Sequence, residues 1–201
     1  MTDLAEVIDA ISAVPHENGR RIIAIAGPPG SGKSTLAETL RGQIEGSCVV
    51  PMDGFHRANA DLERHGLLAR KGAPMTFDVA PFERMLASAA DGDEVEFPIF
   101  DRVQDAVIPS GGAITARHHT VLVEGNYLLL DAAPWDRLHA IWDLRVLLHA
   151  SPEELERRLI DRWLTHGLTL EDATARARAN DLPNALLVGQ QSITPDIVYT
   201  A

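Results

Sequence analysis

Short, nearly continuous apolar segments alternate along the chain with longer segments whose apolar residues recur every three to four positions. The short segments are typical of buried strands, and the longer ones are typical of amphipathic helices. We expect strands at residues 21–26, 48–53, 120–124, 144–149 and near 196–199. We expect helices at residues 4–14, 33–43, near 81–90, 152–165 and 170–180, with an irregular helical segment at 57–70. This order predicts an α/β fold, a three-layer sandwich with a parallel sheet in the middle.

The segment after the first predicted strand carries the strongest motif, because residues 27–34 fit G-x-x-x-x-G-K-[ST], the P-loop of nucleotide-triphosphate-binding proteins. Its glycine-rich backbone directs N–H groups at phosphate oxygens, and the following helix adds the positive end of its dipole. Lys33 would act as a catalytic residue on the β- and γ-phosphates, and the Ser34 hydroxyl would bind Mg²⁺. The predicted nucleotide-binding residues are Gly27, Pro28, Pro29, Gly30, Ser31, Gly32, Lys33, Ser34 and Thr35.

Two further predicted strands end on a carboxylate, Asp53 and Glu124. The carboxyl ends of parallel strands share one edge of a sheet, so both side chains are expected beside the P-loop. Phosphoryl transfer needs one carboxylate that orients the acceptor hydroxyl and another that holds the metal. From their positions alone, Asp53 and Glu124 are candidates for either role. The alternative is that each residue only caps a turn.

Residues 53–78 contain Asp-Gly-Phe, then Asn, a Leu-x-x-x-Gly-Leu turn, Lys-Gly and Pro-x-Thr-Phe-Asp. This block resembles bacterial P-loop pantothenate kinase and, more broadly, the phosphoribulokinase/uridine kinase family. The resemblance extends from about residue 22 to residue 198. It implies an ATP-dependent kinase on a five-stranded parallel sheet of order 2-3-1-4-5. Together with Asn-Asp-Leu-Pro-Asn at 180–184, the pattern is most similar to a branch labelled nucleoside kinase or fructose transport system kinase.

In those kinases the aspartate matching Asp53 is the base toward the acceptor, and the glutamate matching Glu124 lies by the metal. An arginine-bearing helix closes as a lid over the phosphates, which we expect here at residues 152–168. Arg158 and Arg162 are the candidate catalytic arginines, because residues four apart share one face of a helix. The alternative is a solvated charged face. Turn signals within residues 91–119 predict a small hairpin over the acceptor site.

The acceptor itself is left open by the sequence. Uridine kinases carry Pro-x-Tyr-Asp where this chain has Phe100 and Asp101, so the phenol oxygen is missing, and the Ser-His and Tyr-Asp of pantothenate kinases are absent. A nucleoside, a sugar and a pantothenate-like molecule all stay possible. The loop residues near Asp53 are alternatively polar surface groups. The candidate substrate-binding residues are Asp53, Phe55, His56, Arg57, Phe100, Asp101 and Arg102.

Composition narrows the class of protein. A length of 201 residues suits one domain spanning 1–201, and the net charge of −11 disfavours nucleic acid as a partner. No apolar run approaches the roughly 20 residues that span a membrane. The single cysteine, Cys48, is expected to be buried in a strand, which fits a reducing cytoplasm. The oligomeric state is not predicted.

A second class of function competes with the kinase, namely a P-loop ATPase or regulatory switch without a small-molecule acceptor. A GTPase would need an Asn-Lys-x-Asp motif, and the chain has no Asn-Lys pair. A simple ATPase would not need the block at 53–78. His118 and His119 lack partners at metal-binding spacing, so we expect them to be solvent-exposed.

Overall fold

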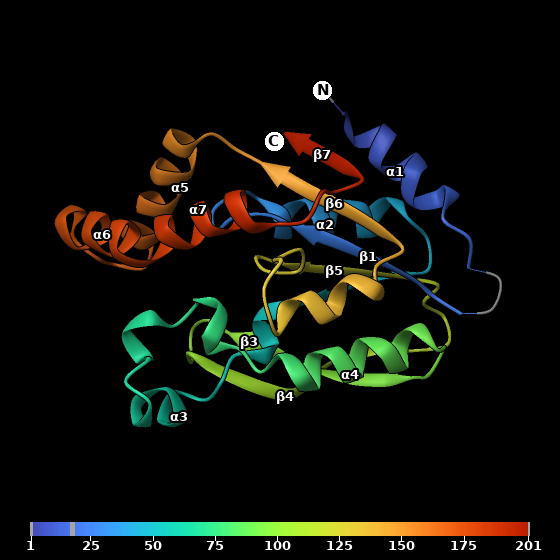
Figure 1. Cartoon of the computed structure of the whole chain (residues 1–201), viewed down its shortest axis with the longest axis horizontal. Coiled ribbons are helices and arrows are strands. Elements are labelled where there is room, and N and C mark those ends of the chain that lie inside the picture. Colours follow the sequence, from blue (N-terminus) through green and yellow to red (C-terminus); the bar gives the residue numbers. More distant parts are fainter. Residues whose placement is uncertain (1, 17–18, 201) are drawn as a thin grey trace.

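The computed structural model describes residues 2–16 and 19–200. Its central sheet has five parallel strands in the order β2-β5-β1-β6-β7 (Figure 1). Counted along the chain within this sheet, the order is 2-3-1-4-5, so the predicted order is confirmed. The strands are β1 (Arg21–Ala26), β2 (Ser47–Pro51), β5 (Thr120–Gly125), β6 (Leu144–His149) and β7 (Ile197–Thr200).

Helices cover both faces of this sheet. Successive residues of a strand point to opposite faces, so each face presents apolar side chains that a helix can bury. On β1, Ile23 and Ile25 pack with helices α1 (Leu4–Ala13) and α2 (Lys33–Gln43). Ile22 and Ala24 pack on the other face with α4 (Val79–Ala90) and the 3₁₀ helix η4 (Trp135–Ala140). The predicted three-layer α/β sandwich is therefore confirmed.

The segment between β2 and α4 is irregular, as expected. It consists of η1 (Met52–Phe55), α3 (Asn59–Arg64), η2 (Leu68–Arg70) and η3 (Pro74–Thr76). The second strand was predicted to reach residue 53, but it ends at Pro51 and Asp53 lies in η1. This difference moves Asp53 from a strand end into a tight turn just beyond it.

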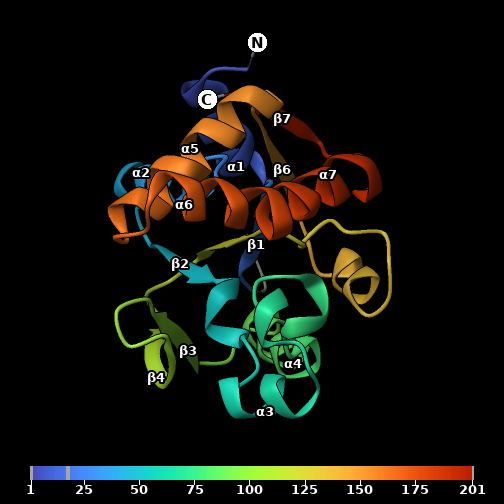
Figure 2. The ribbon, with the colours of Figure 1, turned by 90° about the vertical axis from the view of Figure 1, so that its left-hand side faces the viewer.

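An antiparallel hairpin of β3 (Val95–Asp101) and β4 (Ala106–Ile114) forms a separate two-stranded sheet, which confirms the predicted hairpin. The hairpin packs directly on η1. A Cβ atom at Gly54 would overlap the backbone carbonyl of Pro98, so only glycine allows this close approach. Figure 2 shows α3, β3 and β4 together on one side of the molecule.

Three consecutive helices on the opposite side are α5 (Pro152–Thr165), α6 (Leu170–Arg176) and α7 (Leu182–Gln191) (Figure 2). A single turn of π-helix, η5 (Ala177–Asp181), joins the last two. The sequence predicted only a helix at 170–180. The sequence did not predict α7 because that segment contains Pro183, and proline normally ends a helix. Here it occupies the first turn of α7, where its missing N–H is not needed.

Several smaller predictions concern burial. Cys48 is buried, as expected, and burial raises the pKa of its thiol to about 11. His118 is only 9% exposed, so the prediction that both neighbouring histidines are solvent-exposed is wrong for this one. Its ring accepts a hydrogen bond from the Thr115 backbone N–H at 3.0 Å, and its carbonyl accepts one from Arg20. No helix within 2–16 and 19–200 has both the length and the apolar character needed to cross a membrane.

Candidate active site

The P-loop connects β1 to α2. Gly32 adopts φ +95°, a left-handed conformation that favours glycine, and it is the N-cap of α2 without a side-chain cap. The first backbone N–H groups of the helix are thus not satisfied by a capping side chain and can meet an anion. The buried Ser31 hydroxyl also has no hydrogen-bond partner in the described part of the chain. These features fit a phosphate cradle.

The edge of the sheet brings the predicted charged residues together. β5 lies between β1 and β2, with Gly125 opposite Ala26 and Glu124 opposite Pro51. As a result, Lys33, Ser34, Asp53 and Glu124 line one cavity of about 700 Å³. The sequence placed these side chains at one edge, and the structure brings them there.

Burial is the largest influence on the two innermost charges. Burial lowers the pKa of Lys33, and the negative charges of Glu124 and Asp53 oppose this shift. Burial raises the pKa of Glu124, and the positive charge of Lys33 opposes that shift. Glu124 is only 6% exposed. A buried charge is costly unless it is compensated. A triphosphate beside Lys33 and a cation beside Glu124 would supply that compensation.

Mg²⁺ fits the oxygen donors at this point. The Ser34 hydroxyl donates to the Glu124 carboxylate at 3.1 Å, and both are hard ligands of the kind that Mg²⁺ prefers. Over residues 2–16 and 19–200, no cluster of three or more His, Cys, Asp or Glu side chains forms an all-protein metal cage.

Asp53 faces the hairpin across the cavity. Its Oδ2 atom accepts a hydrogen bond from the Arg102 guanidinium at 2.9 Å, and the Arg102 side chain is 55% exposed. Asp53 and Arg102 both line the cavity, as do His56 and Phe100. The hairpin therefore covers the carboxylate that was predicted to orient the acceptor hydroxyl.

The two predicted lid arginines have different surroundings. Arg162 lines the cavity and donates to Asp181 at 3.3 Å. Burial lowers the pKa of Arg162, and Asp181 opposes that shift. Arg158 donates to the P-loop carbonyl groups of Gly30 at 3.5 Å and Ser31 at 3.2 Å. Arg162 thus faces the cavity, while Arg158 connects α5, the predicted lid helix, to the P-loop backbone.

Three predicted substrate-binding residues are not among those that line the cavity. Phe55 is buried and packs on Phe82 with ring centroids 4.6 Å apart. Arg57 forms an ion pair with Asp61 at 2.6 Å. The Asp101 carboxylate accepts hydrogen bonds from two backbone N–H groups of the hairpin turn, at 2.8 and 3.0 Å. All three have structural partners within their own segments or in the core.

Several cavity residues were not predicted as site residues. They are polar groups from four separate segments: Asn59, Lys71, Asp105, Asn126, Asn180, Asp181 and Asn184. Lys71 and the 180–184 segment belong to the motifs that carry the family resemblance, which was the available signal. Asp105 adopts φ +49° in the hairpin turn and lies 2.8 Å from the Lys71 ammonium, a contact that only the fold reveals.

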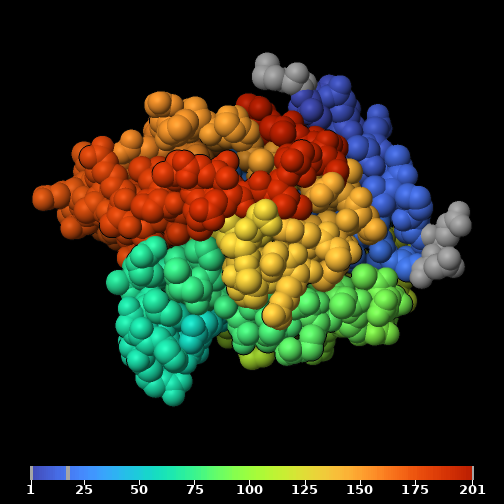
Figure 3. Space-filling model, viewed as in Figure 1, coloured from blue at the N-terminus to red at the C-terminus, as the bar shows by residue number. Residues whose placement is uncertain are grey.

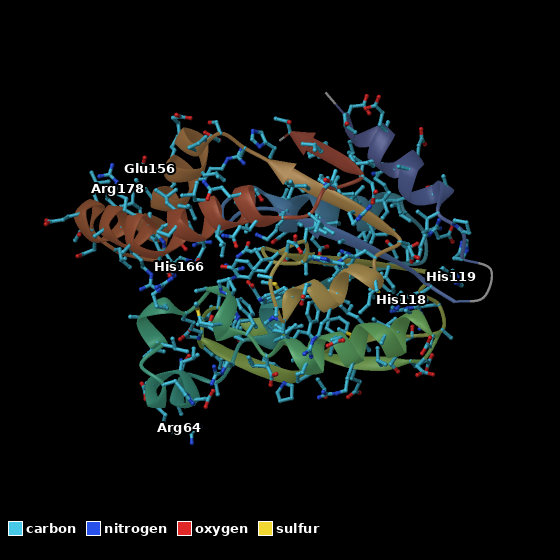
Figure 4. All side chains as sticks on the ribbon, in the orientation of Figure 1. Arg64, His118, His119, Glu156, His166 and Arg178 are labelled. Atoms are coloured by element: carbon cyan, nitrogen blue, oxygen red, sulfur yellow. The ribbon has the colours of Figure 1, made fainter. Side chains whose placement is uncertain are left out.

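The C-terminal helices and the segment around α3 meet at one end of the molecule (Figure 3). His166 lies on the lid at that end and lines the cavity, whereas His118 and His119 lie at the opposite end of the molecule (Figure 4). The exposed pair Arg178 and Glu156, 2.8 Å apart, joins two of the C-terminal helices on their outer side (Figure 4). The cavity therefore lies between the lid side and the hairpin side.

Comparison with known proteins places this geometry in a family. Residues 23–177 match the family model described as an AAA domain. The crystal structure of a provisionally named fructose transport system kinase from Silicibacter sp. TM1040 is 40% identical, with a TM-score of 0.94 over 99% of this chain and 100% of that one. The Escherichia coli protein YggC, which is uncharacterised, is 39% identical over 90% of this chain and 77% of its own length.

A provisionally named uridine kinase of Schizosaccharomyces pombe is 33% identical over 94% of this chain and 86% of its own length. These relatives cover nearly the whole chain, including the P-loop, the hairpin and the C-terminal helices. Together with the P-loop and the two carboxylates at the sheet edge, they confirm the predicted family. The chain belongs to the AAA-domain family of P-loop proteins and, within it, to the small-molecule kinases related to uridine kinase.

Proposed function

We propose that this protein transfers the γ-phosphoryl group of ATP, with Mg²⁺, to a hydroxyl group of a small molecule. The observation that carries the proposal is that Lys33, Asp53, Glu124 and Arg162 line one cavity. These side chains supply the groups that in-line phosphoryl transfer needs: cations for the phosphates, a metal ligand and a base.

The residues divide into distinct roles. Lys33 and the P-loop N–H groups hold the phosphates, and Arg162 adds positive charge from the lid. Ser34 and Glu124 would hold Mg²⁺, which would supply positive charge to neutralise the phosphates. Asp53 uses Oδ1 to orient the acceptor hydroxyl and take its proton, since Oδ2 already accepts from Arg102.

The competing function is ATP hydrolysis without an acceptor. The hairpin and the 57–76 segment favour the kinase, because they build a polar chamber beyond Asp53 that hydrolysis does not require. His56, Asn59, Lys71 and Phe100 line that chamber together with Asp53. We call this part of the cavity the acceptor end, and the part at Lys33, Ser34 and Glu124 the nucleotide end.

An acceptor-dependent assay tests the proposal. ADP formation from MgATP is measured with nucleosides, pentoses, hexoses, their phosphates and pantothenate, for the native sequence and for Asp53→Asn. We expect at least one compound to raise the ADP rate, and Asp53→Asn to remove that stimulation while MgATP still binds. Equal ADP rates with and without every compound would favour the ATPase instead.

We also propose that the protein works in the cytoplasm on small molecules and not on nucleic acid. The net charge of −11 opposes binding to a polyanion, and Cys48 is a free, buried thiol. Cell fractionation tests the location, and recovery in a membrane or secreted fraction would contradict it. A filter-binding assay with single- and double-stranded DNA and RNA tests the partner, and salt-sensitive retention would contradict that part.

A further inference from the structure

Two amide oxygens at the acceptor end are buried without a protein partner. Asn180 is 8% exposed, and its Nδ2 group donates to the Lys71 carbonyl at 3.0 Å. That contact fixes the orientation of the amide, so Oδ1 is left as an acceptor. Neither this atom nor Oδ1 of Asn126 has a hydrogen-bond partner in the described part of the chain, and both residues line the cavity. Buried acceptors of this kind require a donor from a ligand or water.

His56 adds a third acceptor. Its Nδ1 atom lies 2.7 Å from the Asp53 carbonyl oxygen, and a carbonyl only accepts, so Nδ1 carries the proton. Burial lowers the pKa of His56, although Asp53 acts in the opposite direction. The lowered pKa favours the neutral ring. The second ring nitrogen, Nε2, is then an acceptor as well. The acceptor end is therefore matched to a ligand that donates several hydrogen bonds.

Two cations at this end, Lys71 and Arg102, already have anionic partners. The Lys71 ammonium lies 2.8 Å from the Asp105 carboxylate, with the Asn59 amide oxygen at 2.7 Å. Arg102 pairs with Asp53 at 2.9 Å. A phosphate or carboxylate of the acceptor that met Lys71 or Arg102 would have to displace one of these carboxylates.

The aromatic rings of the acceptor end are also engaged. The Lys71 ammonium lies 4.7 Å from the centroid of the Phe100 ring, and the His56 ring lies 4.9 Å from it. Phe77 packs on His56 with centroids 4.0 Å apart and on Trp135 with centroids 5.7 Å apart. The two phenylalanines that line the cavity therefore already pack against other side chains.

We propose that the acceptor is a neutral, non-aromatic, polyhydroxylated molecule, that is, a sugar or a polyol. One hydroxyl lies at Asp53, and others donate to Oδ1 of Asn126, Oδ1 of Asn180 and Nε2 of His56. The inference rests on the proposed kinase function and specifies its substrate class. It separates this chain from kinases of phosphorylated, carboxylated or nucleoside acceptors.

The first test compares kcat/KM for ADP formation across three groups of probes. The neutral group contains D-ribose, D-fructose, D-glucose, ribitol and D-sorbitol. The other groups are the anions ribose 5-phosphate and pantothenate, and the nucleosides uridine and adenosine. We expect the best neutral probe to exceed every member of the other two groups by at least about 10²-fold, because unsatisfied buried acceptors reject a poorly matched ligand. A nucleoside or an anion as the best acceptor would overturn the inference and leave the kinase function standing.

The second test locates the hydroxyl contacts. Each singly deoxygenated analogue of the best neutral probe is assayed with the native sequence, with Asn180→Leu and with the control Gln190→Leu, whose side chain is exposed on the neighbouring helix. We expect one analogue to lose at least about 10²-fold in kcat/KM with the native sequence and the control, and less than about threefold with Asn180→Leu. This coupling separates a ligand contact from a structural role. MgATP affinity and melting temperature verify that each variant is folded.

The outcomes distinguish the two proposals. Deoxygenation penalties that are the same in the native sequence and in folded Asn180→Leu would overturn the Asn180 contact. If that variant does not fold, the native enzyme alone still tests the substrate class. The inference is overturned if every deoxy analogue loses less than about threefold in kcat/KM. If no probe stimulates ADP formation while MgATP binds, the kinase proposal fails and the acceptor class fails with it.

Discussion

The two ends of the cavity are built in different ways. The nucleotide end consists mainly of one continuous segment, the P-loop, and we propose that it binds the phosphates through backbone groups and one lysine. The acceptor end consists of side chains from η1 and the following segment, the β3–β4 hairpin, the end of β5 and η5–α7. Backbone N–H groups recognise the phosphates common to all nucleotides, whereas side chains from separate segments can vary independently. We therefore expect the nucleotide end to bind the phosphates of ATP and the acceptor end to select the substrate.

The core supports this division. The largest group of buried apolar residues and a second one on the other sheet face hold the strands that carry the P-loop and Glu124. The lid helix α5 instead packs through Leu155 and Leu159 in a small cluster with residues of η5 and α7. We expect this predicted lid to move with little disturbance of the sheet, because its apolar cluster is separate from the two clusters that hold the strands. Mobility is thus expected at the lid and not at the P-loop.

The largest effect is expected at the nucleotide end. Lys33→Ala should reduce kcat with every acceptor, at a cost of about 3 kcal/mol or more in the transition state, because it removes charge from the β- and γ-phosphates. Steady-state kinetics and the melting temperature are measured together. The control is Lys71→Ala at the acceptor end, which should change mainly the acceptor KM. Normal turnover in a folded Lys33→Ala protein would contradict the P-loop assignment.

Asp53 joins the two ends, and its replacement should separate them. Asp53→Asn keeps the shape of the side chain but removes the base, so kcat should fall by about 10²-fold or more while MgATP affinity is retained. Isothermal titration with a non-hydrolysable ATP analogue measures the affinity. A parallel loss of affinity and rate would instead indicate a structural or metal-binding role for Asp53.

The lid arginines provide the third test. Arg158→Ala together with Arg162→Ala should lower kcat by at least about 10²-fold with a smaller change in acceptor KM. The exposed Arg157, which pairs with Glu154 and Asp161 on the same helix, gives the control Arg157→Ala with near-normal kinetics. Hydrogen exchange over residues 152–168 should slow when an ATP analogue and Mg²⁺ are added. Unchanged exchange and near-normal activity of the double variant would rule out this lid.

A smaller effect is expected at Asp181, which positions the lid arginine without facing the phosphates directly. Its carboxylate accepts from Arg162 at 3.3 Å and from the Trp163 indole N–H at 2.6 Å. Asp181→Asn keeps an oxygen for the indole but weakens the hold on the guanidinium, so kcat should fall by about tenfold. If Arg162→Ala already removes that contribution, adding Asp181→Asn should have little further effect. Fully additive losses would show that the two residues act independently.

Local patterns were sufficient to predict the α/β layers and the position of the P-loop, whereas the order of the strands came from the family resemblance. The P-loop is a contiguous motif. Asp53, just beyond β2, and Glu124, near the end of β5, reach the same cavity because parallel strands share an edge. The acceptor end could not be predicted in the same way. Asp105 reaches Lys71 only through the hairpin turn, and Asn126 and Asn180, which are far apart in the sequence, line the same cavity only in the folded chain. These contacts depend on tertiary packing and leave no regular spacing in the sequence.

The errors have identifiable physical causes. α7 was missed because Pro183 resembles a helix breaker, although it occupies the first turn of that helix. Phe55 was predicted as a substrate contact because it adjoins Asp53, but the 3₁₀ turn of η1 directs it into the core. His118 was expected to be exposed because no partner was visible nearby. Arg20, which is distant in the sequence, folds against its carbonyl.

The most direct test of the central claim is the fate of the γ-phosphoryl group. Phosphorus NMR of a reaction with MgATP and the best acceptor measures ADP, inorganic phosphate and phosphorylated acceptor together. The account predicts one phosphorylated acceptor for each ADP and little inorganic phosphate, with both products lost in Asp53→Asn. Inorganic phosphate formed in equal amount to ADP, regardless of acceptor, would contradict it and identify a hydrolase.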